Sequence, residues 1–189
     1  MNLFDTTPIK KDTTEDYQTP VDVCKYMVSL IPTGVKTVLE PTPGMGNLVK
    51  QLYDYEVTAP KDFFLLAPQR YDCVVMNPPF SSKSAILENA PKGFDKEGMK
   101  LGYYFLTECM KRSNNIIALM PWFTLSDSDV RLRFIKSFGM VSLTALPRKT
   151  FEYARIQTCV IHLQKGHIGD TVFRVYDLLQ SNPIPLQLF

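Results

Sequence analysis

The sequence Asn-Pro-Pro-Phe, residues 77–80, follows an apolar run and joins an amide to a rigid backbone and an aromatic ring. Neither Pro78 nor Pro79 has an N–H for a sheet ladder, so they end a strand and hold Asn77 and Phe80 in a fixed relation. The side-chain oxygen of Asn77 and the carbonyl of Pro78 can both accept from an exocyclic NH₂, and Phe80 can stack on a planar base. The motif therefore predicts a site that orients a flat amine or amide for reaction at its nitrogen. A rigid turn without chemistry is the alternative.

A second motif, Glu-Pro-Thr-Pro-Gly-Met-Gly, occupies residues 40–46. Gly44 and Gly46 allow a ligand to approach the backbone closely. The third glycine of a dinucleotide fingerprint is missing, and Glu40, which Pro41 follows, would repel a pyrophosphate. A carboxylate there favours a ligand with a cationic amino group, and S-adenosylmethionine carries an amino group and a sulfonium. The motif predicts a cofactor loop, with a simple helix-entry turn as the alternative.

A third motif, Lys-Asp-Phe-Phe, occupies residues 61–64. Asp62 can accept from an adenine amino group, and Phe63 beside it can cover the adenine ring. The alternative is a surface acid next to two phenylalanines of the core.

The segments between these motifs predict the elements that position them. We expect helix 19–31 to begin with Thr19 as its N-cap and Pro20 in its first turn. The cofactor loop should open a second helix that ends near Tyr53, and 81–98 reads as a mobile loop. The remaining helices are expected at 101–112 and 127–138, and strands at 37–40, 56–59, 71–76, 115–121, 140–146, 156–163 and 171–177.

Alternating strands and helices predict a three-layer α/β fold, in which ligands bind at the carboxyl ends of the strands. Glu40 and Asn77 each follow a strand, so we expect them to meet at one edge. Residues 1–16 are expected to be a flexible N-terminal segment. Residues 17–189 are expected to be one catalytic domain without a separate target-recognition domain.

The bulk composition excludes some classes of protein. The 189 residues carry a formal net charge of +2, so charge neither requires nor excludes nucleic acid. Four scattered cysteines and two histidines make a zinc site improbable. No apolar run approaches the roughly 20 residues of a membrane span, and the polar start lacks the apolar stretch of a signal peptide. We therefore expect a cytoplasmic protein with no membrane contact and no metal.

The chain resembles the gamma-class DNA adenine-N6 methyltransferases, which include Type I modification subunits and single-chain Type II enzymes. The resemblance covers about residues 17–166 and implies a class I S-adenosylmethionine-dependent methyltransferase fold, a Rossmann-like three-layer sandwich with a mostly parallel sheet. It also implies methyl transfer to adenine N6 in DNA, after the base has been flipped out of the duplex. The motifs that carry it, in the family's order, are Y-Q-T-P, E-P-T-P-G-M-G, K-D-F-F, N-P-P-F and T-F-E-Y-A-R-I-Q-T-C-V-I-H-L-Q-K-G.

The resemblance also implies a role for each matching residue. Asp62 would contact the cofactor adenine with Phe63 beside it, and Phe151 would pack against the flipped base opposite Phe80. The catalytic tetrapeptide would be Asn77, Pro78, Pro79 and Phe80, and the other cofactor-binding residues would be Thr19, Pro20, Glu40, Pro41, Gly44 and Gly46.

Two departures from the family pattern leave alternatives open. The segment 56–62 is so short that no acid for binding the cofactor ribose is evident in it. This raises the alternative of a degenerate fold that acts as a binding subunit. About two dozen residues follow Gly166, so we expect a minimal enzyme of low specificity, a homodimer, or a catalytic subunit with a separate specificity partner. No endonuclease segment is evident. A small enzyme of this kind suits a bacterial cell, a phage or a mobile element. Methylation of an RNA base or a protein glutamine amide is the other alternative, because the same two acceptors suit any planar NH₂.

Overall fold

A mostly parallel sheet forms the centre of the computed structural model, which describes residues 18–80, 88–91, 99–148, 150–151 and 156–176. The described residues form seven strands in the order β2-β1-β3-β4-β6-β5-β7. Strand β6 is antiparallel to both of its neighbours, and the other pairings are parallel. The strands are β1 Thr37–Leu39, β2 Glu56–Thr58, β3 Cys73–Met76, β4 Asn115–Pro121, β5 Met140–Ala145, β6 Thr158–Gln164 and β7 Val172–Val175. The α/β sandwich and the predicted strands are confirmed.

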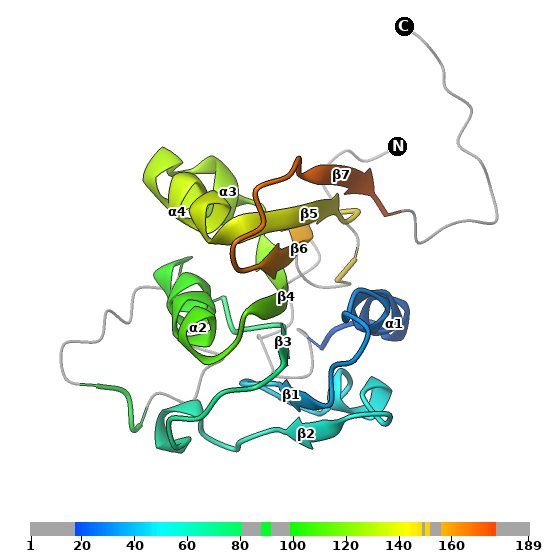
Figure 1. Cartoon of the computed structure of the whole chain (residues 1–189), viewed down its shortest axis with the longest axis vertical. Helices are drawn as coiled ribbons and strands as arrows, with labels where there is room; N and C mark the ends of the chain where they lie inside the picture. The colour runs from blue at the N-terminus through cyan, green and yellow to red at the C-terminus, as the bar shows by residue number, and fades with distance from the viewer. Residues whose placement is uncertain (1–17, 81–87, 92–98, 149, 152–155, 177–189) are drawn as a thin grey trace, which may run out of the picture.

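Helices cover both faces of this sheet (Figure 1). Helix α1 (Val21–Ser29) lies on one face, while α2 (Met99–Arg112), α3 (Phe123–Ser126) and α4 (Asp129–Gly139) lie on the other. Successive side chains of a strand point to opposite faces, so a strand covered on both sides must be apolar throughout. In β3, Val74 and Met76 pack in the core under α2, and Cys73 and Val75 pack in the core under α1. This explains why β3 is apolar throughout.

Two expectations about local structure are wrong. The loop after Glu40 does not open an α-helix, because Gly44 and Gly46 have φ angles of 52° and 80° and keep the chain in turns. Only a three-residue 3-10 helix, η2 (Val49–Gln51), follows. Helix α1 has Pro20 at its N-cap position without a side-chain cap. Thr19 is not the cap, because its hydroxyl bonds to a distant residue described below.

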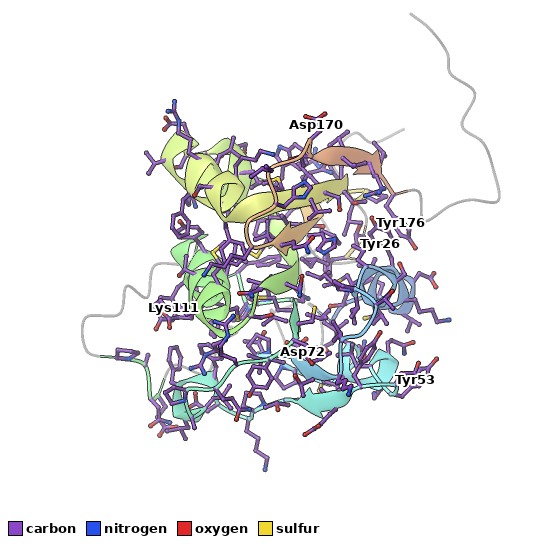
Figure 2. The ribbon with its side chains drawn as sticks, in the orientation of Figure 1. Tyr26, Tyr53, Asp72, Lys111, Asp170 and Tyr176 are labelled. Atoms are coloured by element: carbon purple, nitrogen blue, oxygen red, sulfur yellow. The ribbon has the colours of Figure 1, made fainter. Side chains whose placement is uncertain are left out.

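Polar and aromatic contacts tie segments distant in the sequence to one another. Asp72 accepts from the backbone N–H of Lys36 at 3.0 Å and of Thr37 at 2.9 Å, which holds the beginnings of β1 and β3 together. These hydrogen bonds lower the pKa of Asp72. After β7, Tyr176 stacks on Tyr26 of α1 with 4.6 Å between ring centroids, and Figure 2 shows the two rings side by side.

Two of the predicted segments fall largely on residues that the structure does not describe, and two predicted helices are found with slightly different bounds. The predicted flexible segment 1–16 and most of the predicted loop 81–98 are not described. Helix α2 begins at Met99 and α4 at Asp129, each within two residues of the expected start. Within the described part of the chain, no helix is both long and apolar enough to cross a membrane.

Candidate active site

The register of β1 and β3 brings the motifs that begin at Glu40 and Asn77 to one edge of the sheet. The strands are parallel neighbours, with Leu39 opposite Val74, so both end at the same side of the sheet. Glu40 directly follows β1, and Asn77 directly follows β3. The prediction that these two residues meet at the carboxyl ends of the strands agrees with this register.

Glu40 is a buried acid, with 1% of its surface exposed. Its Oε1 accepts from the backbone N–H of Thr42 at 2.9 Å, and its own N–H donates to the carbonyl of Thr58 at 2.9 Å. Burial raises the pKa of Glu40 to about 8, and the hydrogen bonds from Thr42 oppose this shift. None of the salt bridges among the described residues includes Glu40. A buried carboxyl group without a cationic partner favours a ligand that brings a cation to it.

Asn77 is held at both its side chain and its backbone. Its Nδ2 donates to the Oγ1 of Thr19 at 2.9 Å, and its carbonyl oxygen accepts from the Oγ1 of Thr42 at 3.3 Å. With the nitrogen facing that hydroxyl, the side-chain oxygen of Asn77 lies at the other end of the amide. Pro78, whose carbonyl is the second predicted acceptor, is buried, so the tetrapeptide is anchored as well as rigid.

The segment before α1 also binds the glycine loop. Gln18 Oε1 accepts from the backbone N–H of Met45 at 3.1 Å, and the carbonyl of Thr19 accepts from Asn47 Nδ2 at 3.3 Å. A side chain added at Gly44 would put its Cβ 2.9 Å from Gln18 Nε2. The segment with Thr19 and the glycine loop 40–46 are thus joined by hydrogen bonds. Of the two predicted prolines, Pro20 is half-buried and Pro41 is buried.

Three polar residues of this group were not singled out by the sequence analysis: Gln18, Thr42 and Asn47. Their bonds join segments that are 27 to 35 residues apart, except for the short link from Thr42 to Glu40. Thr42 carried a detectable signal, because a hydroxyl between two prolines, two residues after a buried acid, has few other roles. Gln18 and Asn47 carried none that we recognise.

Asp62 and Phe63 are adjacent in the sequence but lie in different environments, one polar and one in the core. One carboxylate oxygen of Asp62 accepts from the backbone N–H of Phe64 at 2.9 Å and caps the 3-10 helix η3 (Phe63–Leu65), and the other accepts from Asn89 Nδ2 at 2.7 Å. Phe63 is 6% exposed and lies edge-on to Phe105 of α2, with centroids 5.2 Å apart. The ring is therefore part of the main core. A role of Asp62 and Phe63 in binding the cofactor stays a prediction.

Both predicted base-stacking rings belong to the apolar surroundings of the site. Phe151 is buried in the core cluster on the α1 face, and Phe80 is half-buried and packs against that cluster. The first turn of α2 supports the tetrapeptide, since a Cβ at Gly102 would lie 3.7 Å from both Phe80 Cδ1 and Pro78 Cγ. Stacking of a base between Phe80 and Phe151 stays a prediction. Among the described residues, no group of three or more His, Cys, Asp or Glu is arranged to hold a metal ion.

Comparison with known proteins identifies the fold. No family model and no curated protein matches the sequence. Among solved structures, a modification subunit assigned to a type I restriction enzyme of Vibrio vulnificus matches with a TM-score of 0.63 and 18% identity, over 88% of this chain and 48% of that one. The methyltransferase subunit of a type I restriction-modification system of Streptococcus thermophilus matches with a TM-score of 0.62 and 18% identity, over 84% and 46%. A protein of Listeria monocytogenes described as a class I S-adenosylmethionine-dependent methyltransferase matches with a TM-score of 0.62 and 17% identity, over 88% and 68%.

The chain has the class I methyltransferase fold. The fold class predicted from the sequence is confirmed, and its structural neighbours include type I modification subunits, as the resemblance implied. The chain spans about half the length of the two restriction-system proteins that it matches. In this methyltransferase fold, the Glu40–Asn77 group lies at the edge of the sheet where the strand ends converge.

Proposed function

We propose that the chain transfers the methyl group of S-adenosylmethionine to the N6 amino group of adenine in DNA. One observation carries this proposal: a buried acid, Glu40, is joined through Thr42 to an Asn-Pro-Pro-Phe tetrapeptide in a methyltransferase fold. The first group suits a cationic cofactor, and the second suits an exocyclic amine. Their connection by one residue, Thr42, supports a donor site and an acceptor site that lie side by side.

The residues present fit this cofactor. Glu40 would pair with its amino group, since the pair removes the cost of an isolated buried charge. Gly44 and Gly46 would let the loop backbone approach it, and Thr19 and Asp62 would contact its methionine and adenine parts as the resemblance implies. When bound, S-adenosylmethionine supplies an electrophilic methyl group on a sulfonium leaving group.

The acceptor side needs orientation rather than an enzyme nucleophile. The Asn77 side-chain oxygen and the Pro78 carbonyl would each accept one hydrogen of the adenine NH₂, which makes the nitrogen lone pair available to the methyl carbon. The N–C bond would form as the bond between the methyl carbon and sulfur breaks, and the methylated nitrogen would then lose its proton to solvent. Because an adenine inside a duplex has its amino group paired, the base must be flipped out, and Phe80 and Phe151 would pack on its faces.

DNA is the proposed acceptor because the motifs resemble those of DNA methyltransferases and because structural neighbours of the chain belong to restriction-modification systems. A specificity partner or a second copy of the chain would supply sequence recognition. An RNA base and a protein glutamine amide are the competing acceptors, because both present a planar NH₂.

The test is methyl transfer from tritium-labelled cofactor to DNA, RNA and protein in parallel. The DNA arm uses unmethylated duplex and single strands, because a single strand removes the cost of flipping. We expect label in DNA as N6-methyladenine, and its loss in the variant Asn77→Ala. The matched control is Asn115→Ala, since Asn115 begins β4 at the opposite edge of the sheet and should leave transfer intact. Label confined to RNA or to protein would refute the DNA assignment.

A catalytically degenerate fold is tested separately by calorimetry. We expect S-adenosylmethionine to bind the chain and Glu40→Ala to weaken binding. Absence of binding in the presence and absence of DNA would support a binding subunit that has lost catalysis.

A further inference from the structure

The hydroxyl of Thr42 lies between the two halves of the proposed site. Its Oγ1 is 3.4 Å from Glu40 Oε1 and 3.3 Å from the carbonyl oxygen of Asn77. A hydroxyl has one proton, so it donates to only one of these acceptors at a time. The two contacts therefore compete, and the stronger acceptor decides which bond is made.

The charge on Glu40 sets which acceptor is stronger. An ionised carboxylate forms shorter and stronger hydrogen bonds than a neutral carboxyl group or an amide carbonyl. When Glu40 is protonated, Thr42 is expected to donate to Asn77. When a cationic ligand favours the ionised form, Thr42 turns toward Glu40 and releases the Asn77 carbonyl.

The thiols next to Glu40 do not change charge when Glu40 ionises, so the change in hydrogen bonding falls on Thr42. In the part of the chain that the structure describes, the titratable groups that interact with Glu40 are the thiols of Cys24 on α1 and Cys109 on α2. Both thiols are buried, burial raises the pKa of each, and neither ionises at neutral pH. At the other end of the connection, the side-chain amide of Asn77 is anchored on Thr19. A change at the Asn77 carbonyl therefore acts on a residue whose side chain is held in place.

We propose that Thr42 is a positioning residue that couples occupancy of the acidic cofactor subsite at Glu40 to the setting of Asn77 and the Pro78 carbonyl. This rests on the proposed function for its consequence in catalysis. Thr42 touches neither methyl donor nor acceptor in this scheme, and it acts through the two residues that do.

The first experiment measures methyl transfer in a single turnover at saturating cofactor, together with the cofactor Kd, for Thr42→Val and Thr42→Ser. Valine keeps the shape and loses the hydroxyl, while serine keeps the hydroxyl. We expect valine to lower the transfer rate about tenfold, at the upper end for one neutral hydrogen bond, and to change the Kd less. Serine should restore the rate to within about twofold of the unsubstituted protein. Thr107→Val is the matched control, because that hydroxyl donates to the carbonyl of Tyr104 within α2, away from the Glu40–Asn77 group.

A second experiment needs neither cofactor nor activity. The dipeptide Asn-Pro occurs at residues 77–78 and 182–183, so ¹³C-carbonyl asparagine with ¹⁵N-proline labels two peptide bonds in the whole chain. We expect the Asn77 carbonyl shift to titrate with Glu40, to lose at least half of that change in Thr42→Val, and to keep it in Thr42→Ser. Glu40→Gln should abolish the change, and the Asn182 signal is the internal reference.

The outcomes separate this inference from the proposed function. If the unsubstituted protein methylates no acceptor but its Asn77 signal responds to Glu40 through Thr42, the function fails and the coupling stands. If Thr42→Val titrates and transfers methyl like the unsubstituted protein, the coupling is wrong. If serine is as defective as valine, shape rather than the hydroxyl matters, and the coupling is equally refuted.

Discussion

Replacing Glu40 by Gln should remove a pH dependence of stability that the burial of this acid creates. Glu40 is 1% exposed, and burial raises its pKa from 4.5 to about 8. Between these two values the folded protein holds a proton that the unfolded chain has lost. The free energy of unfolding therefore falls as the pH rises through this range, and the contribution is fully present only below the unfolded pKa.

The structure sets the size of the effect. One pKa unit corresponds to about 1.4 kcal/mol, so titration from pH 5 to pH 8 should lower the free energy of unfolding by about 3 to 4 kcal/mol. For a chain of this length each kcal/mol is worth about 2–4 °C, so the expected fall in Tm is about 10 °C. Glutamine stays neutral throughout and keeps an oxygen that can accept from the Thr42 N–H, so its Tm should lack this fall.

The assay is thermal unfolding of both proteins from pH 5 to pH 8, with the difference in Tm as the readout, because groups common to both cancel. Glu56→Gln is the matched control, since Glu56 is an exposed carboxylate at the beginning of β2. Its Tm should follow that of the unsubstituted protein. S-adenosylmethionine should recover part of the lost stability at pH 8 in the unsubstituted protein but not in Glu40→Gln. Parallel curves for Glu40→Gln and the unsubstituted protein would refute the buried acid and the cation subsite derived from it.

Three further predictions follow from the packing. Gly44→Ala should weaken cofactor binding more than Gly46→Ala. Both glycines have positive φ, but only at Gly44 would the added Cβ meet Gln18, which holds the loop. Calorimetry measures cofactor binding to both variants, and equal effects would show that the contact with Gln18 does not matter. Gly139→Ala should lower the free energy of unfolding by about 3 kcal/mol or more, since the φ of Gly139 is 125° and a Cβ there would lie 2.1 Å from the carbonyl oxygen of Gln164. Denaturant unfolding measures this, and a loss under about 1 kcal/mol would contradict the close approach of these two segments. All four cysteines are buried, so a thiol reagent should label the native protein far more slowly than the protein in denaturant, and rapid native labelling would show that the core is open.

The sequence predicted the sheet well where each strand is covered on both faces. Residues 73–76 and 116–121, within the predicted runs 71–76 and 115–121, are continuously apolar because α1 packs on one side and α2 on the other, and no surface helix needs such a pattern. The same reasoning placed Glu40 and Asn77 at one edge, since carboxyl ends of parallel strands meet. Motif chemistry and strand ends together therefore predicted the two centres of the site.

Local patterns were misleading where glycine or a distant partner decided the conformation. Leu48 and Leu52 have the spacing of a helix and are both buried. The positive φ angles at Gly44 and Gly46 keep the preceding residues in turns, and only the 3-10 helix η2 forms. Thr19 has the sequence signature of a helix cap. Its hydroxyl instead accepts from Asn77, which is 58 residues away.

The residue types and their order along the chain thus determined the fold class, the acid at the end of β1 and the amide at the end of β3. The tertiary structure decided how they are connected: Thr19 holds the side-chain amide of Asn77, Thr42 links the backbone carbonyl of Asn77 to the acid, and burial raises the pKa of Glu40. Side-chain types and short-range periodicity are properties of a local segment and are visible in the sequence. Hydrogen-bond partners and desolvation depend on which distant segments fold against one another, and only the packed chain sets them.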